Sequence, residues 1–349
     1  MPRSLLRIVV AEDSPTARRL LVTLLSGDPE LEVVGEACDG QQAVELCKQL
    51  RPDVVTMDIQ MPVMDGVEAT KQIMIELATP VVMVSSLDAS DVRRSMHALN
   101  AGALAVLAKP AGPGTPGFER DSRDLIATIK AMASVKLVRR WSTVPPYRTT
   151  PAVDRAAPAA GSMIAIVAST GGPNAIRRVL SNLPPQVGAP ILIVQHIAAG
   201  FAAGFAQWLH DVTGRVVRMA VDHERVDADV AYVAPDDRHL GITRDRRIAL
   251  SAGPPIGGFR PSGTHLFASL AEACGSHAVG VMLTGMGRDG VEGLRKLAEV
   301  GGHVIVQDEA TSDIYGMPAA AFAAGVVTHT TPLDAIGPRI VELLAAGKP

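Results

Sequence analysis

The stretch MIAIVASTGGP, residues 163–173, holds the signals of a strand, a tight turn and a helix in direct succession. Six apolar residues suit a buried strand, and the small residues and glycines after them allow a sharp turn. Pro173 is favoured in the first turn of a helix, so a helix is expected to begin there. A buried strand that leads at once into a helix is the repeating unit of a parallel α/β sheet.

The same alternation recurs in both directions along the chain. Further strands of the second half are expected at residues 191–195, 230–234, 278–283 and 303–307, with helical stretches at 201–210, 266–274 and 291–300. Strands of the first half are expected at residues 7–11, 33–37, 54–57, 80–85 and 105–108, with a last helix over 119–138. We therefore predict an α/β protein with two doubly wound parallel-sheet domains.

Residues 142–161 interrupt this alternation. They contain four prolines among alanine, threonine and serine, without any periodicity, which is the composition of a linker. We predict a first domain over residues 1–138, a linker over 139–161 and a second domain over 162–349. The length of 349 residues suits two domains.

Composition narrows the class of protein. The chain is 47% hydrophobic and 20% charged, as in an ordinary globular protein. Its net charge of -3 gives no long-range electrostatic attraction to nucleic acid or to an anionic membrane surface. No uncharged apolar stretch is long enough to span a bilayer. The three cysteines lack metal-ligand spacing, and we interpret them as reduced thiols of a cytoplasmic protein.

Acidic residues follow two strands of the first half. Glu12 and Asp13 come after the first strand, and Asp58 comes after the third. The carboxyl ends of neighbouring parallel strands meet at one crevice, where three carboxylates repel one another unless a cation such as Mg²⁺ binds. Ser85 and Lys109 end the fourth and fifth strands, and they can help to neutralise a phosphoryl group on Asp58. Any one of these residues alone would more often cap a helix or face solvent.

With these residues, positions 5–138 resemble the receiver domain of two-component response regulators. The matching motifs are Glu12-Asp13, MDIQMP at 57–62, Asp65-Gly66, Ser85 and Lys109-Pro110. The resemblance implies a flavodoxin-like domain whose Asp58 takes a phosphoryl group from a histidine kinase, with Mg²⁺ held by Glu12, Asp13 and Asp58. Val106 stands where many receivers carry an aromatic residue that swings inward, so we do not expect an aromatic switch.

A hydroxyl, an imidazole and a carboxylate follow three strands of the second half. Ser169 stands at the strand-to-helix turn, His196 closes the next strand, and Asp289 lies in the glycine-rich loop 284–290. The N–H groups at a helix start favour negative charge and can hold an oxyanion. Such a set at one crevice is a candidate for catalysis by serine, histidine and aspartate.

Each of these residues alone has a more ordinary explanation. The turn at Ser169 also suits a phosphate-binding loop, although neither the dinucleotide nor the Walker spacing is present. A lone His196 would more often be a surface or capping residue, and a lone Asp289 would cap the helix after it. The chain order serine, histidine, aspartate differs from the orders of the chymotrypsin, subtilisin and α/β-hydrolase families, which argues against those folds.

Together with their neighbours, these residues make positions 161–346 resemble the catalytic domain of the chemotaxis protein-glutamate methylesterases. The matching motifs lie at residues 168–173, 195–196, 234–235, 238–240, 259–262, 283–290, 307–312 and 315–318. The resemblance implies a Rossmann-like α/β domain without a cofactor, in which Ser169 is the nucleophile, His196 the base and Asp289 the orienting acid. It also implies backbone oxyanion donors at Thr170 and Met286. Two departures are Val167, where the family often has glycine, and Asp236-Asp237, where a glycine is common.

The combined resemblance implies a phosphorylation-activated hydrolase of the cytoplasm. Its substrates would be methylated glutamates on the cytoplasmic helices of methyl-accepting chemoreceptors, and receptor glutamines, which it would deamidate. It would reach the membrane only through receptors and would not bind nucleic acid. We expect the unphosphorylated receiver to obstruct Ser169. Two alternatives stay open: a related hydrolase acting on a non-chemotaxis protein, and a phosphorylation-switched binding module with an inactive triad.

Overall fold

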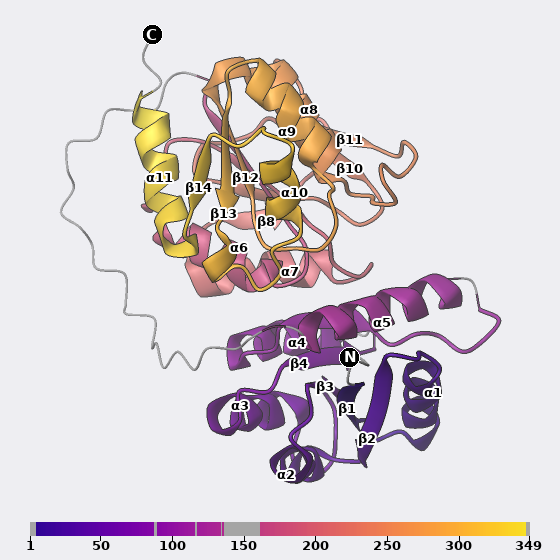
Figure 1. Ribbon diagram of the computed structural model, residues 1–349. Helices are drawn as coiled ribbons and strands as arrows, with labels where there is room; N and C mark the ends of the chain where they lie inside the picture. Colours follow the sequence, from indigo (N-terminus) through magenta and orange to yellow (C-terminus); the bar gives the residue numbers. More distant parts are fainter. Residues whose placement is uncertain (1–4, 87–88, 116, 134, 136–160, 347–349) are drawn as a thin grey trace. The chain divides into compact units, whose positions relative to one another are not determined.

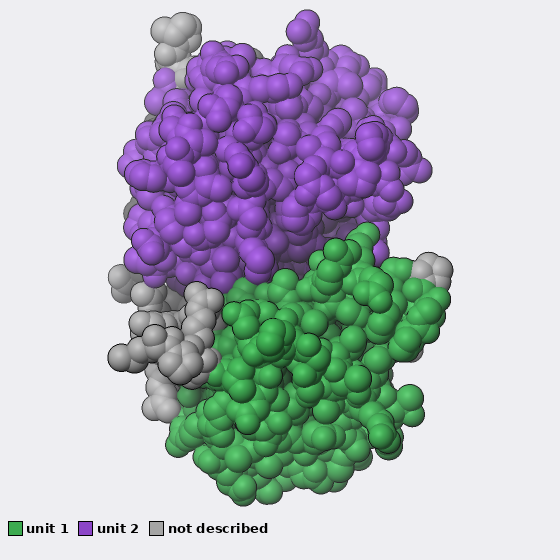
Figure 2. Space-filling view, turned by 45° about the vertical axis from the view of Figure 1, so that its right-hand side comes forward, with its two compact units in different colours: residues 1–141 green, residues 142–349 purple. Residues whose placement is uncertain are grey.

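The computed structural model describes residues 5–86, 89–115, 117–133, 135 and 161–346 (Figure 1). The chain divides into two compact units, Met1–Trp141 and Ser142–Pro349 (Figure 2). The predicted linker, residues 139–161, lies outside the described residues except for Gly161.

The first unit is built on a sheet of five parallel strands in the order β2-β1-β3-β4-β5. The strands are β1 (Leu6–Ala11), β2 (Leu31–Ala37), β3 (Val54–Met57), β4 (Val81–Ser85) and β5 (Ala105–Ala108). The helices are α1 (Pro15–Ser26), α2 (Gly40–Leu50), α3 (Gly66–Glu76), α4 (Ala89–Ala101) and α5 (Phe118–Ala133). Helix α1 contacts α5, whereas α2, α3 and α4 contact one another in series. Strands β3 and β4 are buried along their whole length and consist mainly of apolar residues, with Thr56 and Ser85 as the exceptions.

The second unit has a sheet of seven parallel strands in the order β14-β13-β12-β6-β7-β9-β8. These strands are β6 (Met163–Ala168), β7 (Ile191–Gln195), β8 (Val217–Met219), β9 (Ala231–Val233), β12 (Ala278–Met282), β13 (His303–Gln307) and β14 (His329–Thr331). Strands β10 (His239–Ile242) and β11 (Ile248–Ser251) form a separate antiparallel hairpin.

Two groups of helices surround the seven-stranded sheet. Helix α6 (Gly172–Asn182) contacts both α7 (Ala202–Thr213) and α11 (Leu333–Ala346). Helix α9 (Val291–Glu299) contacts both α8 (Gly263–Cys274) and α10 (Met317–Ala323). A continuous hydrophobic core joins α8, α9, α10 and the β10–β11 hairpin to the sheet. The strand ends that carry polar side chains are therefore held on a rigid frame.

The predicted fold class is confirmed, because both units are parallel-sheet α/β structures. Several bounds differ from the prediction. The last helix of the first unit ends at Ala133, and α6 begins at Gly172, one residue before Pro173. The strands β8, β10, β11 and β14 were not predicted, because their three or four residues include polar residues or glycine and do not form a wholly apolar run.

Two further findings bear on the expectations from composition. Cys38, Cys47 and Cys274 are free cysteines. Across the described parts of the chain, none of the helices combines the length and the apolar character needed to cross a membrane.

Candidate active site

Ser169 lies in a turn that glycines make unusually sharp. It follows β6 directly, and its N–H donates to Thr284 O over 3.1 Å. Gly171 has φ +77°, a left-handed conformation that favours glycine. A Cβ on Gly172 would lie 2.1 Å from Gln195 Oε1. The chain therefore leaves the strand and enters α6 within three residues, and it presents Ser169 at the carboxyl edge of the sheet.

His196 occupies the matching place on the neighbouring strand. Ala168 pairs with Gln195 in the β6–β7 register, so Ser169 and His196 are each the next residue along. Gln195 Nε2 donates to both Ser169 O and His196 O at 2.8 Å. This amide fixes the two backbones to each other. Within the described residues, no hydrogen bond joins Ser169 Oγ to the His196 ring, which is common before substrate binds.

His196 Nε2 lies 3.0 Å from Asp289 Oδ2. Burial alone would raise the pKa of Asp289, but the bonds from His196, Ser262 and Gly263 outweigh it and lower the pKa to about 2. An ionised carboxylate can only accept, so Nε2 carries the proton of the neutral ring. The basic lone pair is then on Nδ1, which is buried without a hydrogen-bond partner among the described residues.

Asp289 is held by the helix on its other side. Ser262 Oγ donates to Oδ1 over 2.7 Å, Gly263 N–H donates to Oδ2 over 2.6 Å, and Thr264 N–H reaches Oδ1 at 3.3 Å. These donors form the N-terminus of α8, where the helix dipole favours a negative charge. Asp289 thus contacts the start of α8, whereas the cap of the following helix α9 is Gly290.

The loop after β12 places free N–H groups beside Ser169. A Cβ on Gly285 would lie 2.7 Å from Ser169 Cβ, so the two backbones touch. Gly285 N–H donates to Ile314 O, and Gly285 O accepts from Met317 N–H, which fixes this loop. In the part of the chain that the structure describes, the N–H groups of Thr170 and Met286 have no acceptor.

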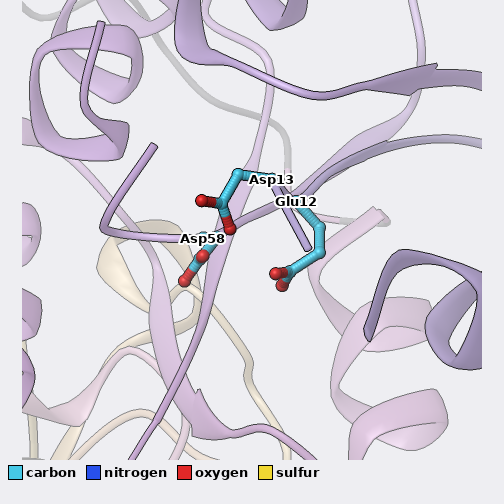
Figure 3. A group of neighbouring side chains, drawn as sticks. All are labelled: Glu12, Asp13 and Asp58. Atoms are coloured by element: carbon cyan, nitrogen blue, oxygen red, sulfur yellow. The ribbon is translucent and has the colours of Figure 1, made fainter. Parts of the chain in front are cut away.

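Three acidic residues of the first unit lie together just past the ends of β1 and β3. One ligand oxygen from each of Glu12, Asp13 and Asp58 lies within 4.8 Å of the others (Figure 3). Glu12 and Asp58 are buried and Asp13 is exposed. Lys109 Nζ lies 2.9 Å from Asp58 Oδ2 and 2.9 Å from Glu12 Oε2.

The charges in this cluster are poorly solvated. Burial raises the pKa of both Glu12 and Asp58, although their hydrogen bonds with Lys109 act in the opposite direction. Three carboxylates beside Lys109 carry more negative than positive charge, and such a close set of hard oxygen donors fits a divalent cation such as Mg²⁺. Ser85 is buried at the end of β4, and its hydroxyl donates to Ser86 O over 3.2 Å. Val106 is buried within β5.

Comparison with known proteins finds a matching family model for each of the two units. A family model described as CheB methylesterase matches residues 164–340, and one described as response regulator receiver domain matches residues 8–115. The chain belongs to the CheB methylesterase family. Within this family, a protein of Anaeromyxobacter dehalogenans named protein-glutamate methylesterase/protein-glutamine glutaminase 3 is 52% identical over 96% of this chain and 98% of its own length. A protein of Myxococcus xanthus named protein-glutamate methylesterase/protein-glutamine glutaminase 4 is 51% identical over 97% of this chain and 96% of its own length.

The second unit is similar in fold to a solved structure of the CheB family. The crystal structure of the Thermotoga maritima CheB methylesterase catalytic domain is 34% identical and covers 52% of this chain and 98% of its own, with a TM-score of 0.51. The seven-stranded unit therefore has the fold of the family's catalytic domain.

Three residues at the catalytic edge were not assigned a role by the sequence. Gln195 and Ser262 lie inside the motifs 195–196 and 259–262, and Ser262, at a helix start, could have been recognised as an N-cap. Phe259 also lies inside the motif 259–262, but its stacking on the His196 ring gave no signal in the sequence because the two residues are 63 positions apart.

Proposed function

We propose that this chain is a receiver-regulated protein-glutamate methylesterase and protein-glutamine glutaminase, with Ser169, His196 and Asp289 as its catalytic set. The observation that carries the proposal is the His196–Asp289 hydrogen bond at the strand edge beside Ser169, in a chain of the CheB family. The full-length relatives named above bear this activity in their names.

The proposed reaction begins at the Ser169 hydroxyl. His196 Nδ1 accepts its proton while Oγ attacks the ester carbonyl, and Asp289 stabilises the imidazolium through Nε2. When the tetrahedral intermediate collapses, the C–O bond breaks and the proton passes to methanol. Water, activated by the same nitrogen, then cleaves the acyl-serine and releases glutamate. A glutamine side chain would react in the same way and release ammonia.

The N–H groups of Thr170 and Met286 are the proposed oxyanion donors. Both are unengaged within the described residues and lie on the two loops that meet at Ser169. Donors already in place cost no reorganisation when the carbonyl oxygen becomes negative, and removing one such donor typically costs about 10²–10³ in kcat. The supporting observation is that Gly285, which precedes Met286, is held by hydrogen bonds on both of its backbone polar groups.

In the first unit, Asp58 is the proposed phosphoryl acceptor and a histidine kinase the donor. Glu12, Asp13 and Asp58 would hold Mg²⁺, which when bound shields the charge on phosphoryl oxygens. Lys109, already within ion-pair distance of Asp58, would hold one oxygen of the phosphoryl group. Ser85 would have to release Ser86 O to reach it.

The proposed substrates are the methylated glutamates and the glutamines of chemoreceptor cytoplasmic helices, and the proposed place of action is the cytoplasm. The test is methanol release from methylated receptor membranes, with and without a small phosphodonor and Mg²⁺. The wild-type chain should release methanol faster with the phosphodonor, and Asp58→Asn should lose only that increase. No release from receptors, with release from a simple methyl ester, would point to another protein substrate.

A further inference from the structure

We propose that Phe259 is a positioning residue for the catalytic base, holding the plane of the His196 ring through a face-to-face stack. The two ring centroids lie 4.1 Å apart with an angle of 12° between the planes. This role rests on the proposed function of His196 as the base.

The stack restricts a rotation of the imidazole that the hydrogen bond from His196 to Asp289 leaves free. That bond fixes one atom of the imidazole, Nε2, at 3.0 Å from the carboxylate, and it leaves the ring free to turn about this contact. The buried Nδ1 has no partner among the described residues that would fix a second atom. A parallel aromatic face at van der Waals distance restricts the remaining rotation. Proton transfer requires the Nδ1 lone pair to point at the Ser169 hydroxyl, so the ring plane matters for rate.

Phe259 is itself presented by a rigid turn. Ile256 and Phe259 exchange two backbone hydrogen bonds of 3.0 Å around Gly257 and Gly258, whose φ angles are +59° and +90°. Two central residues with positive φ make a turn that glycine adopts at little cost. The phenyl ring is therefore placed by the backbone of the turn and not by a flexible loop.

Arginine and aspartate side chains anchor this turn to the loop that carries the base. Arg260 donates to Ala252 O, to Gly253 O and to the carboxylate of Asp237. Asp236, next in the chain, accepts from Gly200 N–H over 2.9 Å, four residues after His196. The acidic pair that departs from the family pattern thus links the phenyl-bearing loop to the imidazole-bearing loop.

The stack also has an electrostatic consequence. His196 becomes a cation when it accepts the serine proton, and a cation over an aromatic face is stabilised by the ring quadrupole. Leucine would fill much of the space without offering that face. The charged groups on the loops around the ring, which stay unchanged in the test, are Asp236, Asp237, Arg238, Arg260, Arg288 and Asp289.

The test compares Phe259→Leu and Phe259→Tyr with Phe322→Leu, the same replacement at an exposed phenylalanine of α10. Methanol release from methylated receptor membranes is measured with the full chain from pH 5 to pH 9. Phe259→Leu should lower kcat about 3- to 30-fold with little change in KM, and should move the acid limb of the profile about half a unit toward lower pH. Phe259→Tyr should have the kcat and the acid limb of the wild type. Phe322→Leu should also match the wild type in both.

Three results would overturn the role of Phe259: an unchanged kcat in Phe259→Leu, a loss without movement of the acid limb, or an equal loss in Phe259→Tyr. If Phe259→Leu does not fold, Gly258→Ala decides by the same readouts, since its new Cβ meets no atom within 4 Å and acts only on the turn. A Ser169→Ala chain measured alongside separates the two proposals. If Ser169→Ala loses activity while the Phe259 variants behave like the wild type, only the role of Phe259 is overturned. If Ser169→Ala keeps its activity, the proposed function is overturned.

Discussion

Asp289 is the residue on which the electrostatics of the catalytic edge depend. Its two oxygens accept from His196 on one side and from the start of α8 on the other. The first contact selects the tautomer of His196, the proposed base, and both contacts lower the pKa of the carboxyl and so keep it ionised, with His196 having the larger effect. The two contacts can be separated by mutation because they involve different partners.

Asp289→Asn should lower kcat about 10²- to 10⁴-fold, because an amide N–H facing Nε2 moves the ring proton to Nδ1 and removes the base. Ser262→Ala is the matched control, since it removes one bond to the same carboxylate and leaves the tautomer unchanged. Steady-state methanol release by the two variants gives the comparison. Equal losses would contradict the tautomer explanation.

Asp313 offers a prediction about stability and pH. Its partly buried carboxyl lies against Gly171, and burial raises its pKa to about 6, against a smaller opposing effect of Arg178. A folded pKa above the unfolded value means that the fold binds the proton more tightly. Ionisation therefore destabilises the fold as pH rises from about 4 to 6, and the full penalty remains above that range.

Asp313→Asn should accordingly raise the free energy of unfolding at pH 8, by at most about 3 kcal/mol, and change it little at pH 4. Urea unfolding at pH 4, 6 and 8 measures this, with Asp211→Asn as an exposed control. A gain that is the same at all three pH values would mean that desolvation is not the cause.

At the scale of elements, the close approach of two loops sets the position of Ser169, the proposed nucleophile. Gly285→Ala would bring a methyl group within 2.7 Å of Ser169 Cβ and 2.5 Å of Met317 sulfur. We expect kcat to fall at least about tenfold, since small displacements at a reacting centre are costly. The matched control is Gly112→Ala, whose new Cβ meets nothing within 4 Å. Normal turnover by Gly285→Ala would show that this contact does not fix Ser169.

The sequence predicted elements whose signal is local. Strands such as β6 and β12 are continuous apolar runs, and the residue that follows a parallel strand must lie at the carboxyl edge. That rule predicted one crevice for Ser169, His196 and Asp289, and the His196–Asp289 hydrogen bond agrees with it. The contacts of Asp289 with α8, the Gln195–Ser169 bridge and the Phe259 stack could not be predicted, because they join residues 25 to 63 positions apart. The β10–β11 hairpin was missed because its two strands mix His239, Gly241 and Ser251 with apolar residues and do not form wholly apolar runs.

At the scale of the whole molecule, the linker sequence limits how the receiver can act on the enzyme. The sequence between the two units, about twenty residues with four prolines and no periodicity, is long enough for the receiver to reach the catalytic unit but too irregular to transmit strain. We therefore predict regulation by obstruction, as a shift between closed and open populations. A fragment of residues 161–349 should demethylate receptors faster than the unphosphorylated full chain. If it is no faster while phosphorylation still activates, the receiver must assist catalysis or docking directly.

Ser169 is the proposed nucleophile of a receptor methylesterase. The most direct measurement is methanol release from methylated receptor membranes by the phosphorylated full chain and its Ser169→Ala variant. Ser276→Ala, an exposed serine at the opposite edge of the sheet, is the control. Ser169→Ala should fold normally and lose about 10⁴- to 10⁶-fold in kcat, whereas Ser276→Ala should match the wild type. Release by a folded Ser169→Ala chain within about tenfold of the wild-type rate would contradict the claim.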